Sequence, residues 1–228
     1  MSDGPHGVAS APIRVLLVDD QDLFREGMRV IIDAQDGLEV VGAASDGAEA
    51  VRLVDALDPD VVLMDIRMPE LDGVEATRQI FLPDRVQQRS RPVRVLVLTT
   101  FDLDDRAATA IRHGASGFIL KDTTPAMLID AIRTVHAGNA VLAPQNLAAL
   151  LSGRFPERVP APESFGTLTE KERDVFDAVA RGASNAEVAK SLFTSESTVK
   201  THVGSILRKL ALRDRVQIVV FAYQYDLV

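Results

Sequence analysis

Cysteine is absent from this chain of 228 residues, which excludes disulfide bonds, thiolate metal ligands and a catalytic thiol. This absence fits a reducing cytosol, although many exported proteins also lack cysteine. No stretch approaches the roughly 18 consecutive apolar residues that a membrane-spanning helix needs. Residues 1–12 have no basic flank and no apolar core, so they predict a loose tail rather than a signal peptide. We therefore expect a cytoplasmic protein without a membrane partner.

Charge is distributed unevenly along the chain. Residues 166–228 carry nine Lys or Arg and eight Asp or Glu, a formal charge of +1. Because the whole chain carries −8, residues 1–165 carry −9. The length fits one large domain or two small ones. The charge difference favours two domains with different partners.

Short apolar runs alternate, up to residue 137, with segments whose apolar residues recur at helical spacing. The runs are continuous and rich in Val, Ile and Leu, which is typical of strands buried on both faces. They cover residues 13–18, 38–44, 61–64, 93–98 and 117–120. The pattern predicts an α/β fold with a doubly wound, five-stranded parallel sheet. Residues 124–138 predict the last helix of this fold, ended by Gly138.

The second part of the chain lacks this alternation. Residues 152–167 contain three prolines among small and polar residues, which predicts a linker. After it, the sequence predicts helices alone. We divide the chain into four segments. These are a disordered tail at 1–12, an α/β domain at 13–137, a linker at 138–166 and a small all-α domain at 167–228.

Acidic side chains follow two of the predicted strands. Asp19 and Asp20 come directly after the first strand, and Asp65 comes directly after the third. The carboxyl ends of such strands meet where ligands bind in open parallel sheets. Carboxylates this close would repel one another, and Mg²⁺ would remove that repulsion. A lone aspartate at a strand end usually caps a helix or turn, but three together predict a metal site.

Two further strand ends carry polar residues suited to a phosphoryl group. Thr99 ends the fourth strand, and Lys121 ends the fifth. A phosphoryl group has three oxygens, which a metal ion, an ammonium and a hydroxyl can satisfy. Asp65 would then be the nucleophile that forms an aspartyl phosphate. Taken singly, a threonine or lysine here would be solvated, but the set of five favours one site.

Four stretches around these strand ends carry a resemblance to a known family: "LLVDDQ" (16–21), "LMDIRMPELDG" (63–73), "VLVLTTFD" (95–102) and "GASGFILKD" (114–122). They resemble the receiver domains of two-component response regulators, and the resemblance covers residues 13–137. It implies a flavodoxin-like fold. It also implies that a sensor histidine kinase is the phosphoryl donor.

The resemblance assigns roles to individual residues. It implies that Asp65 is the phospho-acceptor, that Asp20 binds Mg²⁺ directly and that Asp19 assists through water. The backbone carbonyl of Arg67 is implied as another metal ligand. Lys121 would pair with the phosphate.

Two positions of the receiver pattern concern switching. The resemblance makes Thr99 the switch hydroxyl and Phe118 the switch aromatic, with plain core packing as the alternative for Phe118. Many receivers have proline after the lysine, and this chain has Asp122. His113 and His136 are interpreted as ordinary surface or packing residues.

The all-α part contains two capping signals. Thr169 and Glu172 fit a capping box at the start of one helix, and Ser184 and Glu187 fit another. Two helices joined by the short turn at residues 194–196 describe a helix-turn-helix, whose second helix enters the major groove of DNA. Charged helices are usually solvated faces, and a near-neutral net charge is not typical of a DNA-binding domain.

The stretch "LTEKERDVFDAVARGASNAEVAKSLFTSESTVKTHVGSILRKL" resembles the LuxR-type helix-turn-helix, and with the receiver it indicates the NarL/FixJ class. The resemblance implies DNA contacts by Ser197, Thr198, Lys200, Thr201, His202, Arg208 and Lys209. Lys200 and Thr201 would be nearest the bases. Gly204 replaces a longer side chain of some relatives, and Ala211 replaces a common glycine, which suggests a slightly longer recognition helix.

The last helical segment spaces Val216, Val219, Val220 and Tyr223 along one face. Part of this segment is expected to pack on its own domain, and the family also uses it for dimerisation. Dimers of this type bind paired half-sites related by two-fold symmetry.

We hypothesise a phosphorylation-controlled transcription regulator that binds promoter DNA as a homodimer. It would not be a turnover enzyme, apart from self-phosphotransfer and autodephosphorylation by the receiver. A phosphatase with an aspartyl phosphate is one rival, but such enzymes usually carry a second acid where this chain has Arg67. An orphan regulator controlled without phosphorylation is the other rival.

Overall fold

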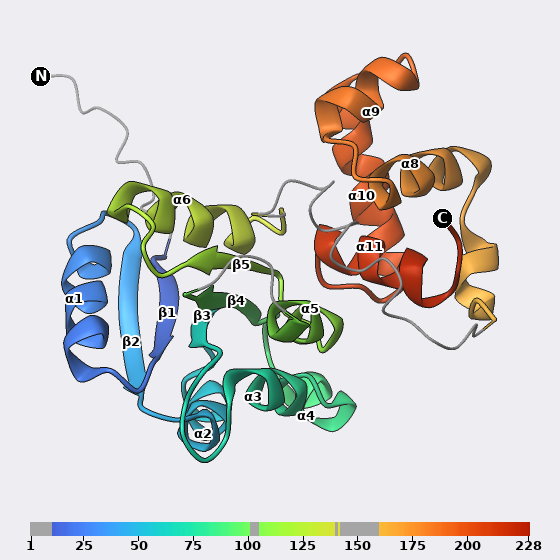
Figure 1. Ribbon diagram of the computed structural model, residues 1–228. Coiled ribbons are helices and arrows are strands. Elements are labelled where there is room, and N and C mark those ends of the chain that lie inside the picture. Colours follow the sequence, from blue (N-terminus) through green and yellow to red (C-terminus); the bar gives the residue numbers. More distant parts are fainter. Residues whose placement is uncertain (1–10, 101–104, 140, 142–159) are drawn as a thin grey trace, which may run out of the picture.

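The computed structural model describes residues 11–100, 105–139, 141 and 160–228 (Figure 1). Five parallel strands form one sheet in the order β2-β1-β3-β4-β5. The strands are β1 Ile13–Val18, β2 Leu38–Ala44, β3 Val61–Asp65, β4 Arg94–Thr99 and β5 Gly117–Leu120. This confirms the predicted flavodoxin-like sheet, with β3 one residue longer and β4 starting one residue later than expected. Within the described residues, no helix is both long and apolar enough to cross a membrane.

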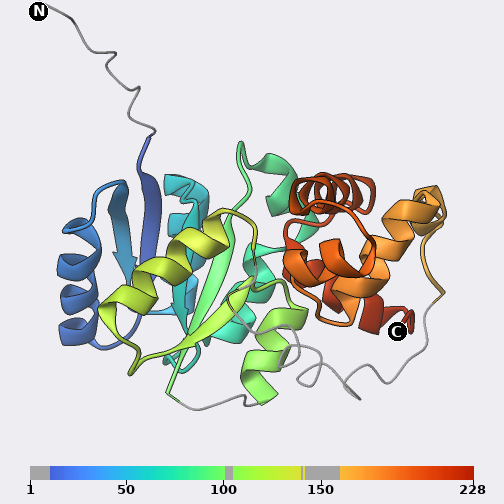
Figure 2. The same ribbon diagram turned by 90° about the horizontal axis from the view of Figure 1, so that it is seen from above.

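Helices cover both faces of the sheet (Figures 1 and 2). Alternate residues of a strand point to opposite faces, so Leu63 and Met64 enter different core clusters. One cluster joins the sheet to α1 Asp22–Asp33 and α6 Pro125–His136. The other joins it to α2 Gly47–Leu57, α3 Gly73–Ile80 and α5 Asp105–Arg112. Both faces are therefore buried, which is why the strands are continuously apolar.

One helix was not predicted. Helix α4, Pro83–Gln88, lies between α3 and β4 and has no buried residue. Pro83 starts it, where a missing backbone N–H does no harm. Arg85 and Arg89, on and just after α4, both form ion pairs with Asp55 of α2. Because α4 has no apolar face, its apolar residues do not recur at helical spacing, and the sequence pattern could not predict it.

The C-terminal part is helical, as predicted. Its elements are η1 Glu163–Thr167, α8 Glu170–Ala180, α9 Asn185–Ser191, α10 Glu196–Lys209 and α11 Arg215–Gln224. Both predicted capping boxes are present, at the starts of α8 and α9. The ring of Phe176 is fully buried, with its centroid 5.1 Å from that of Phe165 and 6.0 Å from that of Phe221. Helices α9 and α10 form the predicted helix-turn-helix.

Helix α10 is not extended at Ala211, and that expectation was wrong. The helix ends at Lys209, and Ala211 adopts a left-handed conformation with φ +54°. The Leu212 N–H donates to the Leu207 carbonyl at 2.8 Å, and the Ala211 N–H donates to the Arg208 carbonyl at 3.3 Å. This pair of bonds is a Schellman motif, which needs a left-handed residue after the helix whether or not that residue is glycine.

Helix α11 packs in two directions. Ile218, Phe221 and Ala222 belong to the core of the helical part, as expected for part of this segment. The opposite face, made by Val216, Val219 and Val220, belongs to the core cluster of the sheet and α5. Figure 1 shows α11 at the boundary between the two parts of the molecule, near α5. The face that the sequence marked for dimerisation is therefore covered in this structure.

Replacing Ala211 with glycine should stabilise the helical part. Ala211 is exposed and loses no packed side chain, whereas a left-handed conformation costs a non-glycine residue about 1–2 kcal/mol. After allowing for the greater freedom of glycine in the unfolded chain, we expect a net gain of about 0.5–1 kcal/mol. Urea unfolding measures it. Gly182, at φ +93°, is the matched control, because Gly182→Ala should destabilise. A destabilised Ala211→Gly would contradict the account of this helix end.

Candidate functional site

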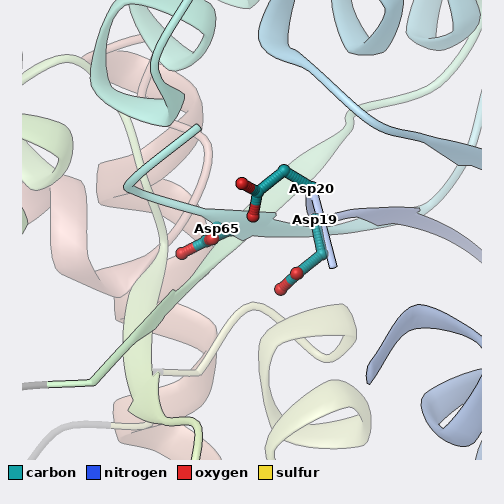
Figure 3. A group of neighbouring side chains, drawn as sticks. All are labelled: Asp19, Asp20 and Asp65. Atoms are coloured by element: carbon teal, nitrogen blue, oxygen red, sulfur yellow. The ribbon is translucent and has the colours of Figure 1, made fainter. Parts of the chain in front are cut away.

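Three carboxylates gather at the carboxyl ends of β1 and β3. Each of Asp19, Asp20 and Asp65 offers an oxygen, and these oxygens lie within 4.8 Å of one another. Figure 3 shows the three side chains converging from the two strands. Asp19 and Asp65 are buried at 2% and 4% exposure, whereas Asp20 is exposed. The structure thus brings together the three acids that the sequence singled out.

The loop after β3 is shaped by Gly73. Its N–H donates to the Ile66 carbonyl at 3.0 Å, which folds the chain back across the end of the strand. A Cβ on Gly73 would lie 1.9 Å from the carbonyl oxygen of Asp65, so only glycine fits this approach. The "LDG" turn in the sequence therefore positions Asp65 at the end of its strand.

Lys121 and Thr99 reach the same edge of the sheet. The Lys121 Nζ lies 2.7 Å from Asp19 Oδ2 and 2.8 Å from Asp65 Oδ2. The backbone N–H of Lys121 donates to the carbonyl of Thr99 at 2.8 Å, so the ends of β4 and β5 are tied together. Thr99 is buried, with 4% exposure. Lys121 is the internal counter-charge for two of the three acids.

Burial governs the electrostatics of this cluster. It raises the pKa of Asp65 more than contact with the Lys121 ammonium lowers it, and the charge of Asp19 adds to the rise. For Lys121, burial lowers the pKa, but contacts with Asp19 and Asp65 outweigh it, so the pKa is raised. One ammonium therefore does not fully compensate these carboxylates.

The residues fit a magnesium ion. The buried Oδ2 of Asp19 contacts Lys121 but accepts no hydrogen bond of good geometry. Mg²⁺ prefers oxygen ligands, binds through one or two carboxylates and retains water, and Asp20 leaves one side of the cluster open to solvent. A hard cation here would offset the negative charge that Lys121 leaves uncompensated.

Arg67 and Phe118 lie close to the expected places. The Arg67 N–H donates to Asp65 Oδ1 at 3.3 Å, so this residue contacts the central acid. Phe118 is buried in the same core cluster as Val97 and Ala108. Its packing fits the core interpretation, and its role as a switch remains a prediction.

Most residues predicted to contact DNA lie on the exposed surface of α10. Ser197, Thr198, Lys200, Thr201 and Arg208 are exposed, and His202 is half-buried. Ser195 caps the helix by accepting a hydrogen bond from the Thr198 N–H at 3.1 Å. The N-terminal end of α10 is thus capped, and most of the predicted DNA-contact residues are left exposed.

Lys209 behaves differently from the other predicted DNA contacts. Its Nζ lies 2.6 Å from Glu172 Oε2 and also donates to the Thr167 carbonyl at 3.0 Å. Hydrogen bonds from Lys209 and Ser205 lower the pKa of Glu172 to about 2. Lys209 therefore joins α10 to α8.

A polar contact between the two parts was missed by sequence reasoning. The buried Ser116 hydroxyl donates to Asp214 Oδ2 at 2.7 Å, and Gln217 Nε2 donates to the Ala115 carbonyl at 3.3 Å. Arg213 Nη2 donates to the Gly114 carbonyl at 3.0 Å. Ser116 and Asp214 are 98 positions apart, so no local pattern could have paired them.

Comparisons with known proteins agree with this geometry. The sequence profile of the family described as "Response regulator receiver domain" matches residues 15–133, and that of "Bacterial regulatory proteins, luxR family" matches residues 166–222. The chain belongs to the NarL/FixJ class of response regulators. This response regulator therefore combines a receiver domain with a LuxR-type DNA-binding domain, as the sequence predicted.

Relatives match the regulator over nearly its whole length. It is 42% identical over 220 residues to the uncharacterized transcriptional regulatory protein YxjL of Bacillus subtilis, covering 95% of this chain and 97% of the relative. It is 37% identical over 217 residues to the response regulator protein VraR of Staphylococcus aureus, covering 95% and 99%. A solved LuxR-family response regulator from Aurantimonas sp. SI85-9A1 is 35% identical, with a TM-score of 0.53, and covers 63% of this chain and 99% of its own.

Magnesium should stabilise the folded regulator through Asp20. Binding at ten times the dissociation constant contributes about 1.4 kcal/mol of stability, which raises the melting temperature. We expect Asp20→Asn to remove this magnesium-dependent increase, because the open ligand of the cluster is lost. Differential scanning calorimetry with and without MgCl₂ measures it. Asp36→Asn, an exposed acid outside the cluster, should respond as the unmodified chain does. An equal response of Asp20→Asn would exclude Asp20 as a ligand.

Proposed function

We propose that this response regulator accepts a phosphoryl group on Asp65 from a sensor histidine kinase and then binds promoter DNA as a homodimer. Residues 13–137 would act as the receiver and residues 167–228 as the DNA-binding domain, joined by a linker at 138–166. The observation that carries the proposal is the contact of Lys121 with both Asp19 and Asp65 beside an open acid. Residues 1–10 of the predicted tail and most of the predicted linker lie outside the described residues.

Phosphoryl transfer would use the side chains already at the site. An oxygen of Asp65 attacks the phosphorus of the donor phosphohistidine, and the histidine nitrogen leaves with the bonding electron pair. Lys121 then pairs with one phosphoryl oxygen, and the Thr99 hydroxyl donates to another. Mg²⁺, when bound through Asp19, Asp20 and the Arg67 carbonyl, supplies the charge that lets these anionic groups approach each other.

The signal would travel through one continuous core. Phosphorylation adds about −1.5 to −2 charges at neutral pH, which draws Thr99 inward and biases the position of Phe118. Phe118 belongs to the same core cluster as Val216, Val219 and Val220 of α11. A shift of Phe118 and α5 therefore alters the surface on which α11 is docked.

Release of α11 would couple this change to DNA binding. The receiver covers the valine face of α11 and leaves the predicted DNA contacts of α10 exposed. The docked state would thus prevent pairing through α11 more than it blocks the DNA-reading surface. A freed α11 could pair with a second copy and place two α10 helices on related half-sites.

Two alternatives involve different chemistry. A hydrolytic phosphatase would usually carry a second acid at position 67, and Arg67 occupies it. An orphan regulator would bind DNA without using Asp65. The incompletely compensated acid cluster favours phosphorylation, since DNA binding alone does not need three carboxylates held so close together.

Asp65→Asn should abolish labelling by acetyl phosphate in the presence of Mg²⁺. The amide lacks the nucleophilic carboxylate, so the mass increase of one phosphate seen for the unmodified regulator should disappear. Intact-protein mass spectrometry measures it, with Asp36→Asn as a labelled control. Labelling retained in Asp65→Asn would refute the assignment of Asp65 as the phospho-acceptor. Absence of labelling in the unmodified chain would favour the orphan regulator.

Ser116→Ala should weaken the docking of α11 without touching the acid cluster. The change leaves the buried carboxylate of Asp214 without a hydrogen-bond donor from the receiver, at a cost of about 1–3 kcal/mol. We expect faster amide exchange in α11 and more dimer at a given concentration without phosphorylation. Hydrogen exchange and sedimentation velocity measure these. Thr109→Ala removes a local hydroxyl on α5 and is the control. Unchanged exchange in Ser116→Ala would exclude this contact as a restraint.

A further inference from the structure

A cavity of about 250 Å³ lies where the receiver meets the DNA-binding domain, away from the acid cluster. We call it the interdomain cavity. Its wall includes the apolar side chains of Phe81, Val86 and Val93 and the guanidinium-bearing side chains of Arg89, Arg91 and Arg213. Arg213 comes from the DNA-binding domain, and the other five come from the receiver. No acidic residue is among the described residues that line it.

Arg213 enters this cavity wall with unused hydrogen-bonding capacity. Its guanidinium lies 3.5 Å from the ring centroid of Phe81, and Nη2 donates to the Gly114 carbonyl. Its Nε is buried and has no hydrogen-bond partner among the described residues. Gly114 leaves room for this arrangement, because a Cβ there would lie 2.4 Å from Arg213 Nη2. Arg213 is therefore fixed in place with one buried donor unsatisfied.

Arg89 shows the same feature from the receiver side. Its side chain is only 7% exposed, with Nη1 donating to the Ile80 carbonyl at 2.7 Å and Nη2 to Asp55 at 2.9 Å. Its Nε is likewise buried and lacks a partner within the described chain. Arg91 is half exposed and lies 3.4 Å from Asp60. Both domains thus contribute guanidinium groups to the cavity wall. Two of these groups, on Arg89 and Arg213, have a buried Nε without a hydrogen-bond partner among the described residues.

No carboxylate is among the described residues that line the cavity, and Asp55 and Asp60 pair with Arg89 and Arg91 from outside its wall. Burial lowers the pKa of Arg213 to about 10, Asp214 opposes the change, and the positive charges of Arg89 and Arg94 reinforce it. Burial also lowers the pKa of Arg89. Buried polar groups without partners are rare in folded proteins and require an explanation. An anion in the cavity would reduce the repulsion between these guanidinium groups and could accept hydrogen bonds from their exposed nitrogens.

We propose that the interdomain cavity binds a small phosphate monoester with an apolar body. Its phosphate would lie between the guanidinium groups of Arg89, Arg91 and Arg213, since forked guanidinium donors match phosphate oxygens. Its apolar part would lie against Phe81, Val86 and Val93. The unpredicted helix α4 supplies part of this wall, which gives that segment a function.

Such a ligand would act as a clamp between the domains. It contacts both domains only while they are docked, so binding favours the docked state by linkage. This consequence, unlike the site itself, rests on the proposed function, in which release of α11 activates the regulator. The ligand would then oppose activation by phosphorylation.

Calorimetric titration of the full chain with phenyl phosphate, in EDTA and without Mg²⁺, tests the site. We expect one equivalent to bind, and at least tenfold weaker binding to Arg89→Gln and to Arg213→Gln. Arg181→Gln, an exposed arginine of the DNA-binding domain, should bind as the unmodified chain does. Val86→Trp fills the cavity without removing a charge and should also abolish binding, which covers the case that an arginine variant fails to fold.

Four further outcomes are decisive. Asp65→Asn should bind phenyl phosphate normally, so the test is independent of phosphorylation, and loss of binding there would place the ligand at the acid cluster and overturn the proposal. Inorganic phosphate should bind more weakly, and equal affinity would exclude the apolar contacts. Benzoate should also bind more weakly, and equal or tighter binding would refute the choice of phosphate. Absence of any binding would overturn the site itself.

Discussion

Repulsion among the carboxylates of Asp19, Asp20 and Asp65 is the constraint on which the rest of this structure depends. The sheet holds these groups together because β1 and β3 are neighbours whose carboxyl ends share an edge. Lys121 offsets only part of the negative charge, since burial still raises the pKa of Asp65. The fold therefore maintains a site that a bound cation would stabilise and that the proposed phosphorylation of Asp65 would change.

The two domains contact each other through packed side chains. Phe118 of β5 and the valine face of α11 share one core cluster, so a rearrangement at the strand ends reaches the DNA-binding domain without crossing solvent. The hydrogen bond from Ser116 to Asp214 adds a polar restraint to this apolar contact. Because packed cores adopt discrete arrangements, such a contact favours switching between two states over gradual bending.

Sequence reasoning succeeded where position follows from a local pattern. Asp65 was predictable because a continuous apolar strand ends on it, and both capping boxes were predictable because three residues separate their partners. Helix α4 could not be predicted, because it has no apolar face. The hydrogen-bond partner of Asp214 could not be predicted either, because it lies in the other domain. The sequence predicted a longer α10 because alanine replaces a common glycine at position 211. The two hydrogen bonds that close the helix end nevertheless hold Ala211 in the left-handed conformation.

If the regulator pairs through α11 as proposed, the double-sided packing of this helix has a consequence for how much of the regulator a cell must contain. Undocking would expose Val216, Val219 and Val220, and returning each to water costs about 1.5–3 kcal/mol when its burial was complete. An undocked solitary chain is therefore a short-lived species that either redocks or meets a second copy. Under the proposed pairing through α11, the response would therefore depend on the copy number of the chain as well as on the stimulus.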